Sequence, residues 1–141
     1  YGIASIHSAF NLDRAQMTER VLKGLAHPKI RIFGHPTGRK LGQREGYELD
    51  WEKIFDFCRK HDKWLEINAW PDRLDLPDTL VREAVKQGVK IIISSDAHAK
   101  EDLRLMAYGV MVARRGWAEK SDIVNSLGCG KMIAKLKGGE I

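Results

Sequence analysis

The sequence predicts an α/β fold in which parallel strands alternate with flanking helices. Short apolar runs that resemble buried strands recur along the chain, and segments with apolar residues at helical spacing follow them. Glycine and proline separate these segments, as at Gly34, Pro36 and Gly88. Strands and helices in this alternation build βαβ units, so we expect a parallel sheet or barrel.

The first part of the chain predicts two strands, each followed by a helix. Residues 1–8 and 30–34 are short apolar runs that read as strands. The helix between them shows apolar residues at helical spacing, namely Met17, Val21, Leu22 and Leu25. Residues 37–46 are rich in glycine and basic side chains without periodicity, which indicates an exposed loop. Asp50 then caps a helix whose apolar stripe consists of Trp51, Ile54, Phe55 and Cys58.

The same pattern continues in the second part of the chain. Residues 64–69 and 89–94 read as strands, and the β-branched second run is typical of a parallel strand covered on both faces. A loop between Pro71 and Pro77 leads into a helix that ends at Gly88, with Leu80, Val81, Ala84 and Val85 on its apolar side. The rest of the pattern predicts a short helix over 101–106, a strand over 109–113, a helix over 121–127, and a short helix with a frayed tail over 128–141.

Composition limits the kinds of protein that this chain can be. Its 141 residues are 43% hydrophobic, enough for one core but not for two ordinary domains. No apolar run approaches the roughly 20 residues of a membrane span, and no signal peptide is recognisable, so we expect a soluble cytoplasmic protein. With only two cysteines, reduced thiols are expected. The net charge of +5 fits either an anionic partner or a generic solvated surface.

Polar residues follow the predicted strands at the point where each strand ends. They are His7, His35, Glu66, Asn68, Asp96 and His98. Ligands of parallel sheets and barrels bind at the carboxyl ends of the strands. Imidazole and carboxylate groups suit Zn²⁺, Mn²⁺ or Fe²⁺, so a metal or phosphate site is predicted here. Two structural interpretations remain open: His35 beside a Gly-Pro turn can be structural, and Asp96 can cap the following helix.

Other polar residues near these strand ends have two interpretations each. Arg39 and Arg73 follow two of the strands, and a guanidinium binds phosphate oxygens in a bidentate manner, so both are predicted to bind substrate phosphate. Arg73 can instead pair with an acidic residue of its own loop, one of Asp72, Asp75 and Asp78. Glu66 and Asn68 are candidates for supporting the metal ligands. Alternatively, Glu66 points into the sheet to meet a buried Arg or Lys and leaves Asn68 at the rim.

Six motifs between residues 2 and 127 carry a resemblance to a known family. They are SIHS, GHPTGR, LEIN, PDRLDLPD, SDAH and ARRGW. Together they resemble the PHP (polymerase and histidinol phosphatase) domain at the C-terminus of bacterial and archaeal family X DNA polymerases. The resemblance implies a distorted (β/α)7 barrel that binds up to three Mn²⁺ or Zn²⁺ ions at its strand ends. It also implies phosphoester hydrolysis, as a 3'-5' exonuclease or in DNA-end processing for DNA repair.

The resemblance also implies roles for individual residues. His7, His35, Asp96 and His98 match metal ligands of the family motifs, and Asp96 and His98 are the predicted catalytic residues, with Asp96 accepting a proton from the attacking water. The H-x-H motif that opens a full PHP domain is absent. We therefore expect residues 1–141 to be the C-terminal part of one PHP domain. Its N-terminal strands and a polymerase domain would belong to the parent chain, and fewer metal ions would bind here.

Three functions are compatible with these observations. The first is a metal-dependent phosphoesterase acting on DNA 3' ends, although this piece alone is expected to have weak or absent activity. The second is a non-catalytic DNA-binding or structural module of the polymerase, whose basic loop 37–46 contacts backbone phosphates. The third is a small-molecule phosphatase of the histidinol phosphate type, which ARRGW and PDRLDLPD disfavour.

Overall fold

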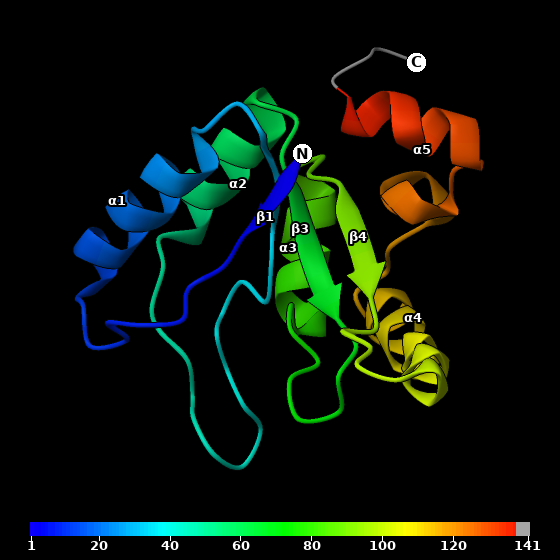
Figure 1. The fold of residues 1–141 in the computed structure, drawn as a ribbon. Helices are drawn as coiled ribbons and strands as arrows, with labels where there is room; N and C mark the ends of the chain where they lie inside the picture. The colour runs from blue at the N-terminus through cyan, green and yellow to red at the C-terminus, as the bar shows by residue number, and fades with distance from the viewer. Residues whose placement is uncertain (138–141) are drawn as a thin grey trace.

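A computed structural model describes residues 1–137 and shows a parallel four-stranded sheet with the strand order β1-β2-β3-β4 (Figure 1). The strands are β1 (Gly2–Ala4), β2 (Ile30–Phe33), β3 (Trp64–Asn68) and β4 (Ile91–Ser94). Each strand pairs in parallel with the next one along the chain. This sequential order is that of a barrel-type sheet, whereas doubly wound sheets reverse their order at a switch point. The predicted α/β fold is confirmed, and its arrangement is that of a partial TIM-like barrel.

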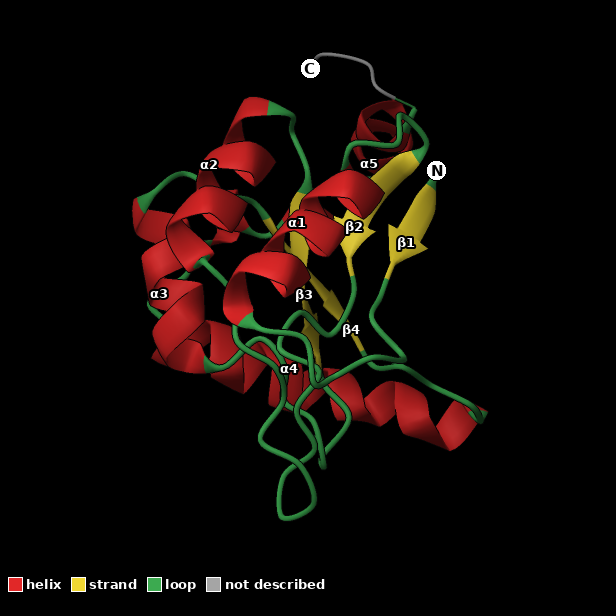
Figure 2. Ribbon diagram, turned by 90° about the vertical axis from the view of Figure 1, so that its left-hand side faces the viewer, coloured by secondary structure: helices red, strands yellow, loops and turns green. Residues whose placement is uncertain are grey.

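One helix follows each of the first three strands. These helices are α1 (Arg14–Leu25), α2 (Trp51–Lys60) and α3 (Asp78–Lys86). Figure 2 views the sheet from the side of α1 and α2. Asp13 caps α1 by accepting a hydrogen bond from the Gln16 amide at 2.8 Å, and Asp50 caps α2 as predicted, with the Lys53 amide at 3.3 Å. These caps satisfy amides that the first helical turn leaves without partners.

Successive side chains of a strand point to opposite faces of the sheet, so the core is divided into two clusters, one on each face. Leu65 and Ile67 of β3 face the large cluster formed with the helices α1 to α3 and with α4 (Met106–Arg115). Trp64 faces the other side, where it packs with Ile32 and Val124, and where residues of α5 (Cys129–Leu136) cover it. A strand that is buried on both faces must be apolar almost throughout, so Glu66 and Asn68, which are also buried, require a specific reason.

The predicted strand over 109–113 is wrong, because the segment lies inside helix α4 (Met106–Arg115). Its buried residues Gly109, Val112 and Ala113 follow helical spacing, which the short β-branched run obscured. A Cβ atom at Gly109 would lie 2.4 Å from Cγ2 of Ile93, so α4 approaches the sheet closely at this glycine. Close packing against the sheet thus outweighs the local strand propensity.

The segments before and after α4 form 3₁₀ helices at the places where the sequence predicted helices. The expected helix over 101–106 is the 3₁₀ helix η1 (Lys100–Leu105), which continues into α4. The expected helix over 121–127 is wrong: it consists of two short 3₁₀ turns, η2 (Lys120–Asp122) and η3 (Val124–Ser126). Ile123 between them is extended and forms a parallel bridge with Ile91, so pairing beside β4 interrupts the helix.

The C-terminal segment contains the predicted short helix, α5, whereas the frayed tail predicted after it falls on residues 138–141, which lie outside the described residues. Cys58 is a buried free thiol and Cys129 an exposed one, as expected for reduced cysteines. Within residues 1–137, no helix is long and apolar enough to cross a membrane.

Candidate active site at the strand ends

The loops that follow the four parallel strands begin at the same edge of the sheet (Figure 1), and the predicted polar residues lie in these loops or at the ends of the strands. His7 follows β1, His35 follows β2, and Asp96 follows β4. His35 and Asp96 have positive φ angles of 32° and 53°. Non-glycine residues rarely adopt this conformation, and it concentrates at functional sites. The backbone thus turns sharply at two of these strand ends.

His35 is buried beside His7 with one ring nitrogen unused. The ring centroids of the two histidines lie 5.0 Å apart, at an interplanar angle of 90°. The Nδ1 atom of His35 is buried and has no hydrogen-bond partner among the described residues. Burial, and then the positive charge of Arg73, lower the pKa of His35, which favours the neutral form of its imidazole. A neutral imidazole with a free nitrogen is what a divalent metal requires.

Asp96 and His98 are held by hydrogen bonds that leave ligand atoms free. The Asn68 side-chain amide donates to Oδ2 of Asp96 at 3.2 Å. His98 Nδ1 lies 2.7 Å from the backbone carbonyl of Asp96. Because a carbonyl only accepts, Nδ1 must carry the proton, which makes Nε2 the nitrogen with the free lone pair. Both side chains belong to exposed residues, and their positions suit contact with a ligand.

Glu66 connects the ends of three strands from a buried position in β3. Its carboxylate accepts a hydrogen bond from the His35 amide at 2.6 Å and another from the Ser94 hydroxyl. Burial raises the pKa of Glu66. These partners differ from the buried Arg or Lys that one interpretation expected. Glu66 therefore orients the residues around His35 and does not form an ion pair with a basic side chain among residues 1–137.

Asp75 connects the loops that follow β2 and β3. It is fully buried, and its carboxylate oxygens accept hydrogen bonds from the Thr37 amide at 3.1 Å and the Gly38 amide at 3.0 Å. Burial raises the pKa of Asp75 to about 6. The sequence suggested Asp75 only as a partner for Arg73. Its position instead explains why the GHPTGR and PDRLDLPD motifs occur together: one carboxylate holds both loops.

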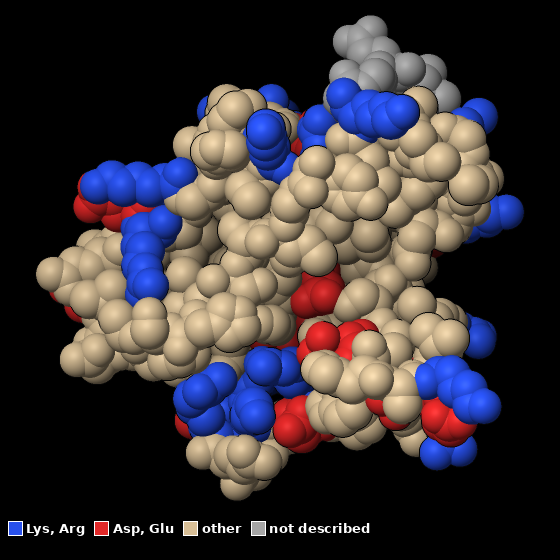
Figure 3. Space-filling model, viewed as in Figure 1, with Lys and Arg blue, Asp and Glu red and all other residues tan. Residues whose placement is uncertain are grey.

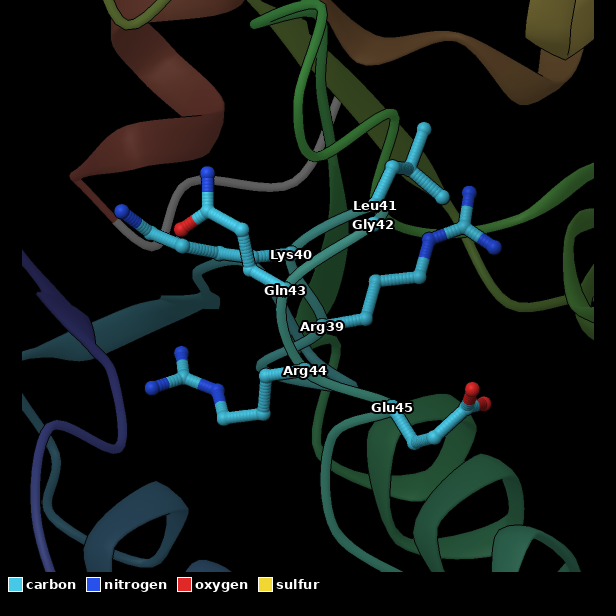
Figure 4. Close-up of a pocket in the computed structure, with 7 residues that line it drawn as sticks. All are labelled: Arg39, Lys40, Leu41, Gly42, Gln43, Arg44 and Glu45. Carbon is cyan, nitrogen blue, oxygen red and sulfur yellow. The ribbon is translucent and has the colours of Figure 1, made fainter.

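The two arginines that were predicted to bind phosphate have different environments. Arg39 donates from Nε to the Arg73 carbonyl at 2.8 Å and from Nη2 to the Leu74 carbonyl. Figure 4 shows Arg39 pointing to the opposite side of its loop from Lys40. Arg73 lines a cavity of about 310 Å³ together with Asp96 and His98, and its Nη1 is buried without a partner among the described residues. The geometry therefore favours Arg73 for phosphate, while Arg39 secures the neighbouring loop.

The same cavity contains residues that the sequence did not single out as site residues. Lys40, Trp70 and Asp72 complete its lining. Lys40 also belongs to the basic loop, in which Lys40 and Arg44 point to the same side (Figure 4). Figure 3 shows Lys and Arg side chains gathered beside acidic ones in the lower part of the view, around the strand-end loops. A basic residue in a loop after a strand was the available signal for Lys40, whereas no pattern in the sequence pointed to Trp70.

The donor chemistry at the strand ends fits a divalent metal, but the ligand set is incomplete. His7 and His35 form one pair, Asp96 and His98 another, and His35 feels the negative charge of Asp96. No group of three or more His, Cys, Asp or Glu side chains converges on one point within the described part of the chain. The unused Nδ1 of the buried His35 remains the strongest sign of a missing partner. Metal binding by these four residues stays a prediction.

The fold and the site together define a barrel-type α/β domain with a polar, imidazole-containing site at the strand ends. The chain is 41% identical, over 96% of its length, to DNA polymerase/3'-5' exonuclease PolX of Bacillus subtilis, and it spans 24% of that protein. It is 26% identical to probable phosphatases of Thermoanaerobacter sp. and Thermoanaerobacter pseudethanolicus, again over 96% of its length and spanning 56% of each. No family model matches the chain. These similarities confirm the resemblance to the PHP region of a family X DNA polymerase.

Proposed function

We propose that this chain forms part of a metal-dependent phosphoesterase site that hydrolyses phosphodiester bonds at DNA 3' ends. The observation that carries the proposal is the buried His35, whose ring lies beside that of His7 and whose Nδ1 has no partner among the described residues. The names of the similar proteins, a 3'-5' exonuclease and probable phosphatases, support hydrolysis of a phosphoester. Because the chain spans only part of each, both the reaction and the substrate are proposals for this protein.

The four predicted ligands His7, His35, Asp96 and His98 would hold Mn²⁺ or Zn²⁺, which would supply a water of lowered pKa and neutralise charge on the phosphate. Arg73, at the wall of the cavity, would bind the non-bridging oxygens of the phosphate. The Asn68 amide donates to Oδ2 of Asp96, which leaves Oδ1 either to bind the metal or to accept a proton from the attacking water. Glu66 would keep the backbone of His35 in place.

Exposed site residues offer the cleanest test, because their replacement leaves the core intact. In the full-length protein that carries this chain, we expect Asp96→Asn and His98→Ala to reduce Mn²⁺-stimulated release of nucleotides from a 3' end by about 100-fold or more, since even outer-shell changes at metal sites cost roughly 10- to 100-fold. Asp56→Asn in α2 and His61→Ala at the C-cap of α2 are matched controls away from the site. Rates equal to those of the unmodified protein in the two site variants would refute the proposal.

Two other functions make different predictions in the same samples. A non-catalytic DNA-binding module is favoured by Lys40 and Arg44, which point to the same side of the basic loop (Figure 4). That function predicts DNA binding that weakens with salt, without hydrolysis. A small-molecule phosphatase is favoured by the names of the Thermoanaerobacter proteins. It predicts faster hydrolysis of a phosphomonoester than of a DNA 3' end.

A further inference from the structure

An aromatic side chain forms part of the wall of the candidate active site. Trp70 is half-buried in the loop that follows β3, and it lines the cavity of about 310 Å³ beside Arg73 and His98. The Trp70 and His98 ring centroids lie 5.7 Å apart in an edge-to-face arrangement, with an interplanar angle of 75°. The volume is at the lower end of the range for small-molecule sites, roughly 300 to 1,000 Å³, and suits a unit the size of one nucleotide.

The backbone of Trp70 is held on both sides. Its amide donates to the Asn68 side-chain carbonyl at 3.0 Å, and its carbonyl accepts hydrogen bonds from the amides of Arg73 at 2.8 Å and Leu74 at 3.0 Å. Asn68 is also the residue that holds Asp96. One amide side chain thus sets the positions of the aromatic residue and the predicted catalytic carboxylate relative to each other. Such preorganisation is what a ligand-binding aromatic needs.

Two basic side chains, Lys40 and Arg73, line the same cavity as the aromatic residue, together with the carboxylates of Asp72 and Asp96. Lys40 forms a salt bridge with Asp72, with 4.0 Å between Nζ and Oδ2, whereas Arg73 has a buried Nη1 without a partner among residues 1–137. Arg73 therefore has hydrogen-bonding capacity that a phosphate can use. A planar apolar surface beside cationic groups is the combination with which proteins bind single-stranded nucleic acid, because the phosphate meets the charges while the base stacks.

We propose that Trp70 is the stacking platform for the terminal base of a nucleic-acid strand, with the adjoining phosphate bound between Arg73 and the pair Asp96 and His98. The inference rests on the proposed phosphodiester hydrolysis and specifies its substrate as a base-bearing nucleotide. A purely structural Trp70, which only supports His98, would affect substrates with and without a terminal base equally. The ratio between two such substrates therefore separates the two roles.

The test uses two fluorescein-labelled single strands that differ only at the 3' end, which carries either a normal nucleotide or a stable abasic residue. Binding to the full-length protein is measured by fluorescence anisotropy without added metal, so that hydrolysis does not interfere. Stacking on an aromatic side chain should favour the base-bearing end by about tenfold. Trp70→Ala should reduce this ratio to about one, whereas Trp70→Phe should retain most of it. Trp117→Ala is the matched control, since Trp117 is exposed and packs on Arg82 elsewhere.

Each outcome bears on the inference. A ratio near one in the unmodified protein overturns it, and so does a ratio that survives Trp70→Ala. Mn²⁺-stimulated hydrolysis is measured on the same strands. Hydrolysis that does not depend on the terminal base overturns the role of Trp70 but leaves the proposed function standing. A Trp70-dependent binding preference without any hydrolysis supports the base platform and overturns the proposed reaction.

Discussion

Asp75 should make the folded protein less stable as the pH rises from about 4 to about 6. The side chain is fully buried, and burial raises its pKa from 3.8 to about 6 despite hydrogen bonds from the Thr37 and Gly38 amides. The folded state therefore binds the proton of Asp75 more tightly than the unfolded state. The stabilisation from this group is fully present below about pH 3.8 and is lost as the pH rises through about 6.

The size of this effect follows from the shift in pKa. A change from 3.8 to about 6 is roughly two units, and each unit corresponds to about 1.36 kcal/mol, so ionisation of Asp75 costs about 3 kcal/mol of folding free energy above pH 7. About 2 kcal/mol of this cost develops between pH 4.5 and pH 7.5. An asparagine side chain at this position would have nearly the same shape without a proton to lose. The Asp75→Asn substitution should therefore remove this part of the pH dependence.

The measurement is urea unfolding followed by circular dichroism at several pH values from 4.5 to 7.5. The free energy of unfolding of Asp75→Asn, relative to the unmodified protein, should increase by about 2 kcal/mol across this range. Glu66, whose pKa is also raised, is present in both proteins, so its contribution cancels. Glu48→Gln, which removes an exposed carboxylate, serves as the control. A difference between Asp75→Asn and the unmodified protein that stays constant with pH would refute the reasoning.

Four further substitutions test the packing, one helix cap and one buried hydrogen bond by urea unfolding. Gly109→Ala should destabilise the protein by about 1 to 3 kcal/mol, because its Cβ would meet Cγ2 of Ile93 at 2.4 Å. Gly24→Ala, with open space around it in α1, should instead stabilise by about 0.5 to 1 kcal/mol, and equal effects of the two would contradict this account of α4. Asp13→Ala should cost about 1 kcal/mol through the lost cap, and an unchanged midpoint would show that the cap contributes nothing. Glu66→Ala should cost at least about 1 to 3 kcal/mol by leaving the His35 amide without its acceptor, which a wild-type midpoint would disprove.

The fold class was predictable because its signals are local. The stripe of Ile54, Phe55 and Cys58 predicts the buried face of α2, and Asp50 predicts where the helix begins. The four observed strands each overlap a predicted apolar run. The segment 109–113 was predicted wrongly because a run of five residues with two valines fits both periods. As a helix, this segment packs against Ile93 of the sheet through Gly109. So short a pattern does not reveal that contact.

The candidate site was predictable in its location but not in its contacts. His7 and His35 were placed at strand ends, and the structure brings their rings to 5.0 Å. Phosphate binding by Arg39 and Arg73 stays a prediction, but the contacts of Arg39 were not predictable: its guanidinium bonds to the carbonyls of Arg73 and Leu74. Both arginines occupy similar positions after strands in the sequence. Only the path of each loop decides which guanidinium faces the cavity.

The amino-acid sequence alone specifies the alternation of strands and helices and the set of polar residues at the strand ends, because periodicity and caps depend on near neighbours in the chain. Tertiary structure decides how loops from different strands meet. The tertiary structure brings the Asp75 carboxylate within hydrogen-bonding distance of the Thr37 and Gly38 amides, and it places Trp70 beside His98. These contacts join residues that lie far apart in the chain, and they form only once the sheet has set the strand ends side by side. The chemistry of the site thus depends on distances that local pattern does not encode.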